Sequence, residues 1–130
     1  MNNNQIKITS KIKEAIQNNK PIVALESTLI SHGFPYPDNI SVANESIKAV
    51  EESGSIAATI GIINGIIKIG LDKDDIEILA STKNVEKVSL HNIALSLFNK
   101  KNAATTVAAT INIASKIGIN FFATGGIGGV

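Results

Sequence analysis

An acidic side chain stands at the end of a short apolar run near the start of the sequence. Glu26 follows Ile22–Leu25 directly, and Ser27 and Thr28 come next. At the end of a buried strand a carboxyl group is shielded from water, which favours its protonated form and suits a proton donor near neutral pH. The alternative for Glu26 is a surface carboxylate just beyond the strand. The neighbouring hydroxyl groups can bind a substrate or stabilise the loop.

A lysine and a glycine run are the other candidates for a site. Lys87 precedes Val88 and Ser89 at the end of a predicted strand, where its ammonium group can meet a phosphate or a sugar oxygen. A solvated surface lysine is the alternative. The glycine-rich run at residues 125–129 lets backbone N–H groups approach an anion. It lacks the Lys-Ser/Thr ending of a P-loop and the spacing of a dinucleotide-binding fingerprint, and a structural turn is an equal alternative.

Composition and charge argue against several function classes. The 12 basic and 11 acidic residues give a formal charge of +1, which supplies no broad positive field for nucleic acid or a membrane surface. With four Phe, one Tyr and no Trp, stacking surfaces for nucleic acid are scarce. The two histidines, His32 and His91, have no spacing typical of a metal site.

The same composition predicts a cytoplasmic protein. The absence of cysteine excludes disulfides and thiolate chemistry within these 130 residues. No apolar run approaches the ~20 residues of a membrane span, and residues 1–20 lack the apolar core of a signal peptide. No contact with a membrane is therefore expected.

Local patterns predict alternating strands and helices. β-branched runs on either side of Asn64-Gly65 predict a hairpin, because this pair suits the positive φ angles of a two-residue turn. Asp72 is predicted to cap one helix, and Asp38 or Asn39 another. The predicted elements are a helix after Thr9, a strand over 21–25 covered on both faces, an irregular Pro-containing loop over 31–39, a helix over 40–53, strands 56–63 and 66–69, a helix after Asp72, a strand around Lys87, a helix through Phe98, a helix after Thr106 and a strand over 119–123.

This alternation predicts an α/β fold. Parallel neighbours require crossover helices, so the expectation is a layered α/β/α sandwich with a mixed, mainly parallel sheet that is incomplete at the C-terminus. Residues 1–130 are expected to form a single α/β domain. Sites in such sheets gather at the carboxyl ends of strands, where Glu26, Lys87 and the glycine run are all predicted to lie.

Taken together, six motifs resemble one enzyme family far more specifically than any single motif does. The resemblance is to the pseudouridine-5′-phosphate glycosidase family, also called the indigoidine synthase A-like family, and it extends from about Pro21 to the last residue. The motifs are Val23–Thr28 (VALEST), Ile30–Pro37 (ISHGFPYP), Ala58–Gly61 (ATIG), Glu86–Ser89 (EKVS), Ala104–Thr110 (ATTVAAT) and Phe122–Val130 (FATGGIGGV).

The resemblance implies an enzyme that acts on a small nucleotide. Members of this family cleave the carbon–carbon glycosidic bond of pseudouridine 5′-phosphate reversibly, giving uracil and ribose 5-phosphate. They use a divalent cation, typically Mn²⁺, and a lysine that forms an imine with the opened ribose. A protonated imine supplies the electron sink that an unactivated carbon–carbon bond needs. A homo-oligomer, a trimer by resemblance, is expected of the full-length protein.

Three residues carry over onto the family's site. The resemblance implies that Glu26 is the catalytic proton donor and that Lys87 contacts the substrate. Val107 matches a further substrate-binding position, and it is expected to act through its backbone N–H because its side chain has no polar group.

Other parts of the family's site have no match in these residues. After the motif that ends at Val130, family members continue with His-Arg, a metal-binding aspartate and the imine-forming lysine. No metal ligand is therefore assigned, and the chain is interpreted as the N-terminal portion of a longer family domain, inactive by itself. The alternatives are a non-catalytic phosphate-binding or oligomerisation module and a pseudogene product.

Overall fold

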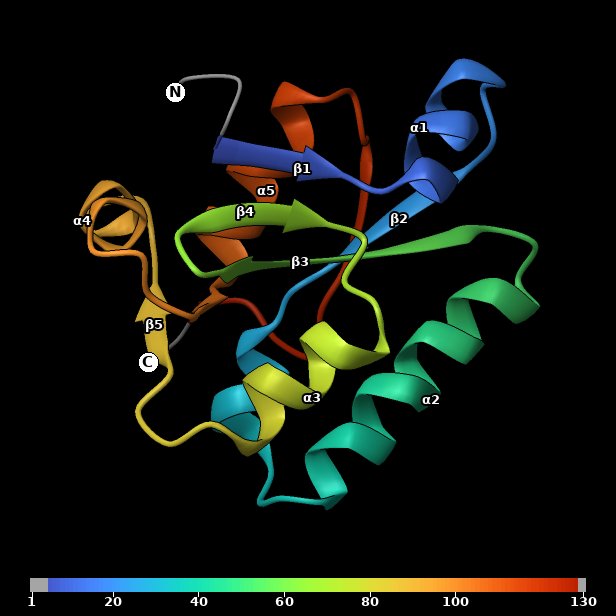
Figure 1. Cartoon of the computed structure of the whole chain (residues 1–130). Helices are drawn as coiled ribbons and strands as arrows, with labels where there is room; N and C mark the ends of the chain where they lie inside the picture. The colour runs from blue at the N-terminus through green and yellow to red at the C-terminus, as the bar shows by residue number, and fades with distance from the viewer. Residues whose placement is uncertain (1–4, 129–130) are drawn as a thin grey trace.

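The computed structural model describes residues 5–128, which form a seven-stranded mixed sheet with helices on both faces (Figure 1). Gly129, the last glycine of the predicted anion-binding run, lies outside the described residues. The elements are β1 (Ile6–Ile8), α1 (Ser10–Gln17), β2 (Ile22–Leu25), the π-helical turn η2 (Leu29–Gly33), α2 (Asp38–Glu52), β3 (Ile56–Ile63), β4 (Ile66–Ile69), α3 (Lys73–Ser81), β5 (Glu86–Val88), α4 (Ile93–Phe98), β6 (Ala103–Thr105), α5 (Val107–Lys116) and β7 (Phe121–Ala123).

The eight-residue strand β3 organises the sheet. Along one side it pairs with antiparallel β4, which in turn pairs with parallel β1. Along the other side its first half pairs with parallel β2 and its second half with antiparallel β6. Parallel β7 lies beyond β2, and parallel β5 lies beyond β6. The two halves of β3 therefore carry two separate pairs of parallel strands.

The helices form two layers, one on each face of the sheet. Figure 1 shows α1 and α5 on one side and α2 and α3 on the other. Alternate residues of β3 feed two cores: Ile60 and Ile62 pack with α1, α4 and α5, whereas Ile63 packs with α2 and α3. This arrangement confirms the predicted α/β/α sandwich with a mixed, mainly parallel sheet.

The hairpin forms where the sequence predicted it. Asn64 and Gly65 have φ angles of 50° and 73°, and β3 and β4 pair from Ile63 opposite Ile66. Gly65 is required for a second reason, since a Cβ atom there would lie 2.6 Å from the carbonyl oxygen of Leu97. The backbone conformation of the turn and the packing against Leu97 therefore both require glycine at this position.

Helix capping follows the prediction at α3. The Asp72 carboxylate accepts a hydrogen bond from the Asp75 N–H at 2.9 Å, and the Asp75 carboxylate accepts from the Asp72 N–H at 3.1 Å. This reciprocal pair is a capping box. α1 begins after Thr9 as predicted, and Thr9 occupies its N-cap, but the Thr9 side chain makes no capping hydrogen bond.

The predicted caps of α2 are wrong. The helix already begins at Asp38 after Pro37, and neither Asp38 nor Asn39 caps it. Asn39 is buried, and its side-chain amide donates instead to the carbonyl oxygens of Ile30 at 2.8 Å and Ala80 at 3.0 Å. Burial against η2 and α3 therefore gives this side chain a tertiary role in place of a capping one.

Three short elements were not predicted from the sequence. The turn η2 occupies the start of the segment predicted to be irregular, and α2 already begins at Asp38, so only residues 34–37 match that prediction. The strands β1 and β6 were not predicted, because each has three residues and forms only by pairing with a distant partner. β6 is the more important of the two, since its last residue, Thr105, contacts Ser27, the residue after Glu26.

We expect the Asp72 cap to stabilise the fold by an amount that depends on pH. The hydrogen bond from the Asp75 N–H, with a smaller contribution from the Lys68 ammonium, holds the pKa of Asp72 below its ordinary value of 3.8. A carboxyl with a depressed pKa stabilises the fold fully above its unfolded pKa and loses that contribution as the pH falls through the folded value.

We therefore expect Asp72→Asn, which keeps a capping oxygen without a titratable charge, to be less stable than the parent at pH 6. The difference should shrink as the pH falls below about 3.8, the ordinary value of the group. Urea unfolding followed by circular dichroism between pH 2.5 and pH 6, chosen as about one to two pH units either side of that value, measures it. A difference that does not change with pH would contradict the assignment.

Candidate functional site

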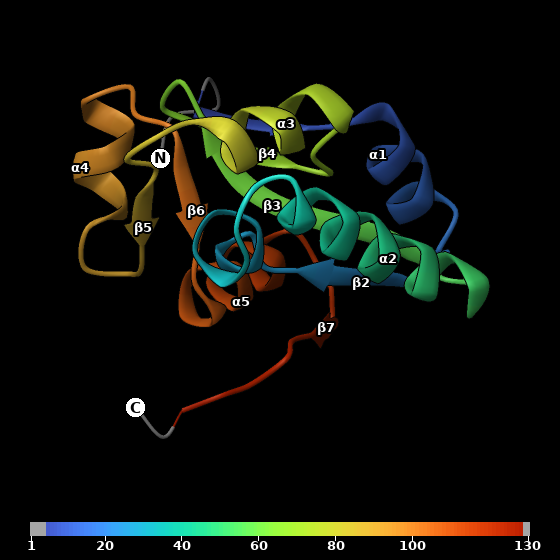
Figure 2. The ribbon, with the colours of Figure 1, turned by 90° about the horizontal axis from the view of Figure 1, so that it is seen from below.

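The candidate site lies where four strand ends converge beside β3. β2 ends with Leu25 opposite Thr59, and antiparallel β6 places Ala104 opposite Gly61. β2 and β6 therefore lie end to end along the same side of β3, and their carboxyl ends point toward each other. Because β7 is parallel to β2 and β5 is parallel to β6, their carboxyl ends converge there as well (Figure 2).

The predicted site residues come near one another for a reason that differs in part from the expected one. Carboxyl ends of parallel strands share one edge of a sheet, which explains why β2 and β7 place their following residues together. β5 and β6 run in the opposite direction, and they join the site only because they meet β2 and β7 head to head. The mixed sheet thus concentrates the ends of two parallel pairs at one place.

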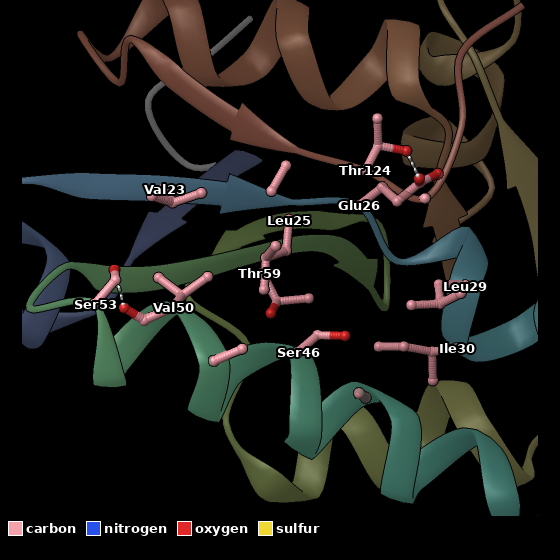
Figure 3. A pocket seen from close by; sticks show the side chains of 14 residues that line it. Val23, Leu25, Glu26, Leu29, Ile30, Ser46, Val50, Ser53, Thr59 and Thr124 are labelled. Carbon is pink, nitrogen blue, oxygen red and sulfur yellow. Dashed lines mark hydrogen bonds between the residues drawn. The ribbon is translucent and has the colours of Figure 1, made fainter.

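Glu26 is held at this place by two hydroxyl groups. Its side chain is half-buried. The hydroxyl of Thr28 donates to Glu26 Oε2 at 2.5 Å. The hydroxyl of Thr124 donates to Glu26 Oε1, as Figure 3 shows. One donor comes from the turn after β2 and the other from the residue after β7, so the carboxyl group is tied to both strand ends.

Thr124 is a site residue that was not predicted from the sequence. Ala123 pairs with Leu25, which places the next residues of both strands, Thr124 and Glu26, side by side. The sequence did contain a signal, since Thr124 is the first polar residue after its strand, as Glu26 is after β2. Which two strands are neighbours cannot be read from that signal alone.

A groove of about 440 Å³ opens beside Glu26, between α2 and the strands β2, β3 and β7. Figure 3 shows Glu26 and Thr124 at one end of it and Val50 and Ser53 at the other. Its walls are largely apolar, as in many small-molecule sites. Val23 of β2 lines the groove and is only half-buried, whereas Leu25 on the same face is buried, so the predicted cover on both faces of this strand is incomplete only at Val23.

Lys87 and Val107 lie on the strand and helix that approach from the opposite direction. Lys87 is exposed in the middle of β5, and Val107 is half-buried at the first position of α5. The Thr106 N–H donates to the Val88 carbonyl at 2.9 Å, which joins the two segments. N–H groups in the first turn of a helix have no acceptor within the helix, so the Val107 N–H is available to an anion.

The described part of the glycine run has open space where Cβ atoms would lie. A Cβ atom at Gly125, Gly126 or Gly128 would meet no atom within 4 Å, so lack of space does not require glycine there. The Gly126 N–H lies 3.3 Å from the Thr124 hydroxyl oxygen, to which it donates. The anion-binding role of the run therefore stays a prediction, with a structural turn as the alternative.

The described residues do not form a metal site. Between residues 5 and 128, no three His, Cys, Asp or Glu side chains lie close enough together to hold an ion. The hard oxygen or nitrogen donors that Mn²⁺ prefers are thus not assembled in this part of the chain. In the same range, no helix has both the length and the apolar character needed to cross a membrane.

Comparison with known proteins identifies the family. The family described as "Indigoidine synthase A like protein" matches residues 11–130. The chain belongs to the indigoidine synthase A-like family. The Staphylococcus aureus pseudouridine-5′-phosphate glycosidase is 51% identical over 125 residues, and the Escherichia coli protein of the same name is 48% identical over 126. Each match covers 96% of this chain but only 41% and 40% of the relative, respectively.

Solved structures give the same relationship. The prealnumycin C-glycosynthase AlnA, solved in complex with ribulose 5-phosphate, superimposes with a TM-score of 0.85 and 41% identity. An indigoidine synthase A-like protein from Thermotoga maritima superimposes with a TM-score of 0.81 and 33% identity. Both matches cover 96% of this chain and 40% of the other, so the chain spans about two fifths of the length of its relatives.

Proposed function

We propose that this chain provides the proton-donor part of a pseudouridine-5′-phosphate glycosidase. The observation that supports this most directly is the position of Glu26, whose carboxyl group is held by Thr28 and Thr124 where four strand ends converge. The names of the relatives supply the reaction: cleavage of a carbon–carbon bond between a ribose phosphate and uracil.

Each predicted site residue has a role in this proposal. When the glycosidic bond breaks, the bonding electron pair remains on the uracil carbon, which takes up a proton from Glu26. Lys87 and the N–H of Val107 approach from β5 and α5 and bind the phosphate or sugar oxygens of the substrate. The ribose carbon must then be stabilised by a nucleophile. We propose that this nucleophile is the imine-forming lysine of the family, and we assign that lysine and the Mn²⁺ ligands to residues outside the described part.

The remaining features of the proposal concern assembly and location. Leu90, Leu95 and Phe98 lie on or next to α4 and are 54%, 62% and 81% exposed. Exposed apolar side chains of this size mark association surfaces, which supports a homo-oligomer, and we propose the trimer. A cysteine-free sequence and a nucleotide monophosphate substrate support a cytoplasmic location.

The proposal predicts that the purified chain alone releases no uracil from pseudouridine 5′-phosphate and binds no Mn²⁺ tightly by calorimetry. The rebuilt enzyme, in which this chain is joined to the C-terminal part of the Staphylococcus aureus relative, should release uracil when Mn²⁺ is added. Substantial turnover by the chain alone would refute the division of roles. An inactive rebuilt enzyme, with a chain that still binds ribose 5-phosphate, would favour the non-catalytic module instead.

A further inference from the structure

Three buried hydroxyl groups connect the strand ends that carry the predicted site residues. Ser27, Thr105 and Thr110 are each 0% exposed. Ser27 follows Glu26 at the end of β2, Thr105 is the last residue of β6, and Thr110 lies in the first turn of α5. The three side chains therefore meet where β2 and β6 meet end to end.

The protons of this cluster can be assigned one by one. The Thr105 hydroxyl lies 2.7 Å from the Ile60 carbonyl oxygen, which can only accept, so Thr105 donates to it. Thr105 Oγ1 then accepts from the hydroxyls of Thr110 at 2.9 Å and Ser27 at 3.2 Å. The Ser27 oxygen in turn accepts from the Thr105 N–H at 2.8 Å. All three hydroxyl protons are donated and Thr105 Oγ1 uses both lone pairs, so the cluster is satisfied without water.

Backbone hydrogen bonds extend this cluster to the rest of the site. The Ser27 N–H donates to the Thr105 carbonyl at 3.3 Å, and the Thr106 N–H donates to the Val88 carbonyl at 2.9 Å. Each of the three predicted site residues is the direct neighbour in sequence of Ser27, Thr106 or Val88. The cluster thus links the proton donor to both predicted substrate-binding segments.

The surroundings leave the cluster little freedom to shift. Gly61 of β3 lies against it, and a Cβ atom at this position would be 3.2 Å from Ser27 Oγ. The same atom would be 3.0 Å from Leu79 of α3 and 3.1 Å from Leu71, both of which are buried. Ser27 is therefore packed closely against β3, in a low-dielectric environment where hydrogen bonds are strong and directional.

We propose that Ser27, Thr105 and Thr110 are positioning residues that fix the Glu26 carboxyl group relative to the amino end of α5. The proposal rests on the proposed function for the identity of the reaction, but its geometric part concerns this chain alone. A proton donor misplaced by about 1 Å can lose roughly 100-fold in rate, so a cluster that sets this separation acts on the chemical step. A cluster with only a stabilising role would act on folding and leave the chemical step unchanged.

The first test uses the chain itself and amide hydrogen exchange. Thr105→Val keeps the size of the side chain and the backbone N–H but removes the hydroxyl shared by all three residues. We expect the amides of Ser27 and Thr106 to exchange roughly 10-fold faster, with no comparable change at Ile67 in β4. Ile12→Val, a core truncation in α1, is the matched control and should affect amides throughout. Equal acceleration of all amides by Thr105→Val would overturn the proposal.

The second test uses the rebuilt enzyme. Thr105→Val is expected to lower kcat roughly 10- to 100-fold with a nearly unchanged KM, and Thr105→Ser should restore most of the activity by restoring the hydroxyl. If Thr105→Val does not fold, Thr110→Val can be used instead, because it removes only one donor. It should also lower kcat with a nearly unchanged KM, but to a smaller extent. Loss of stability with unchanged kcat would refute the positioning role. If the parent rebuilt enzyme releases no uracil, the proposed function fails, and the exchange experiment still decides the geometric part.

Discussion

Replacing Glu26 with glutamine in the rebuilt enzyme is expected to lower kcat by about 10²- to 10⁴-fold while leaving KM nearly unchanged. Glutamine has almost the same shape: its amide oxygen can accept a hydrogen bond from one of the two hydroxyls of Thr28 and Thr124, and its NH2 group can donate to the oxygen of the other. It cannot donate a carboxylic proton to the departing uracil carbon, and that proton is needed only in the transition state. Steady-state uracil release measures both constants.

Lys87→Ala is the matched comparison for this prediction. Lys87 is exposed on β5 and is assigned to binding, so its loss removes a contact that exists before the chemical step. It should therefore raise KM, with a smaller fall in kcat. If Glu26→Gln kept a near-normal kcat, or if both variants changed mainly KM, Glu26 could no longer be assigned as the acid.

The largest loss of stability is expected from Asp75→Ala. Asp75 is 4% exposed, and both of its carboxylate oxygens lie 2.5 Å from the Lys68 ammonium nitrogen. Removing the carboxylate leaves a largely buried ammonium group without its main partner and also breaks the capping box at Asp72. We expect the free energy of unfolding to fall by about 3–5 kcal/mol. Urea unfolding at pH 7, followed by far-ultraviolet circular dichroism, measures it.

A double variant separates the buried charge from the lost cap. Lys68→Met together with Asp75→Leu replaces the ion pair with apolar side chains of similar size, which is often close to neutral for stability. It should recover much of the loss, although the capping contribution of Asp75 stays absent. A double variant as unstable as Asp75→Ala would show that the unpaired ammonium group is not the cause.

Local sequence patterns were sufficient to predict the elements whose stabilising interactions are local. The turn at Asn64-Gly65 needs positive φ angles, and the cap at Asp72 is completed by Asp75 only three residues away. The strand before Glu26 was predicted from a continuous apolar run, which required no knowledge of its partners. In each of these cases the decisive interaction lies within a few residues of the pattern that predicts it.

The arrangement of the site, by contrast, was decided by tertiary structure. Ala-Ala-Thr at residues 103–105 has no pattern that distinguishes a strand from the start of a helix, and it becomes β6 only because β3 and β5 pair with it. The contact between Glu26 and Thr124 spans 98 residues, and that between Ser27 and Thr105 spans 78. The residue types were visible in the sequence. Their partners were not, because register and strand order across such separations depend on the packing of the whole sheet between its two helical layers.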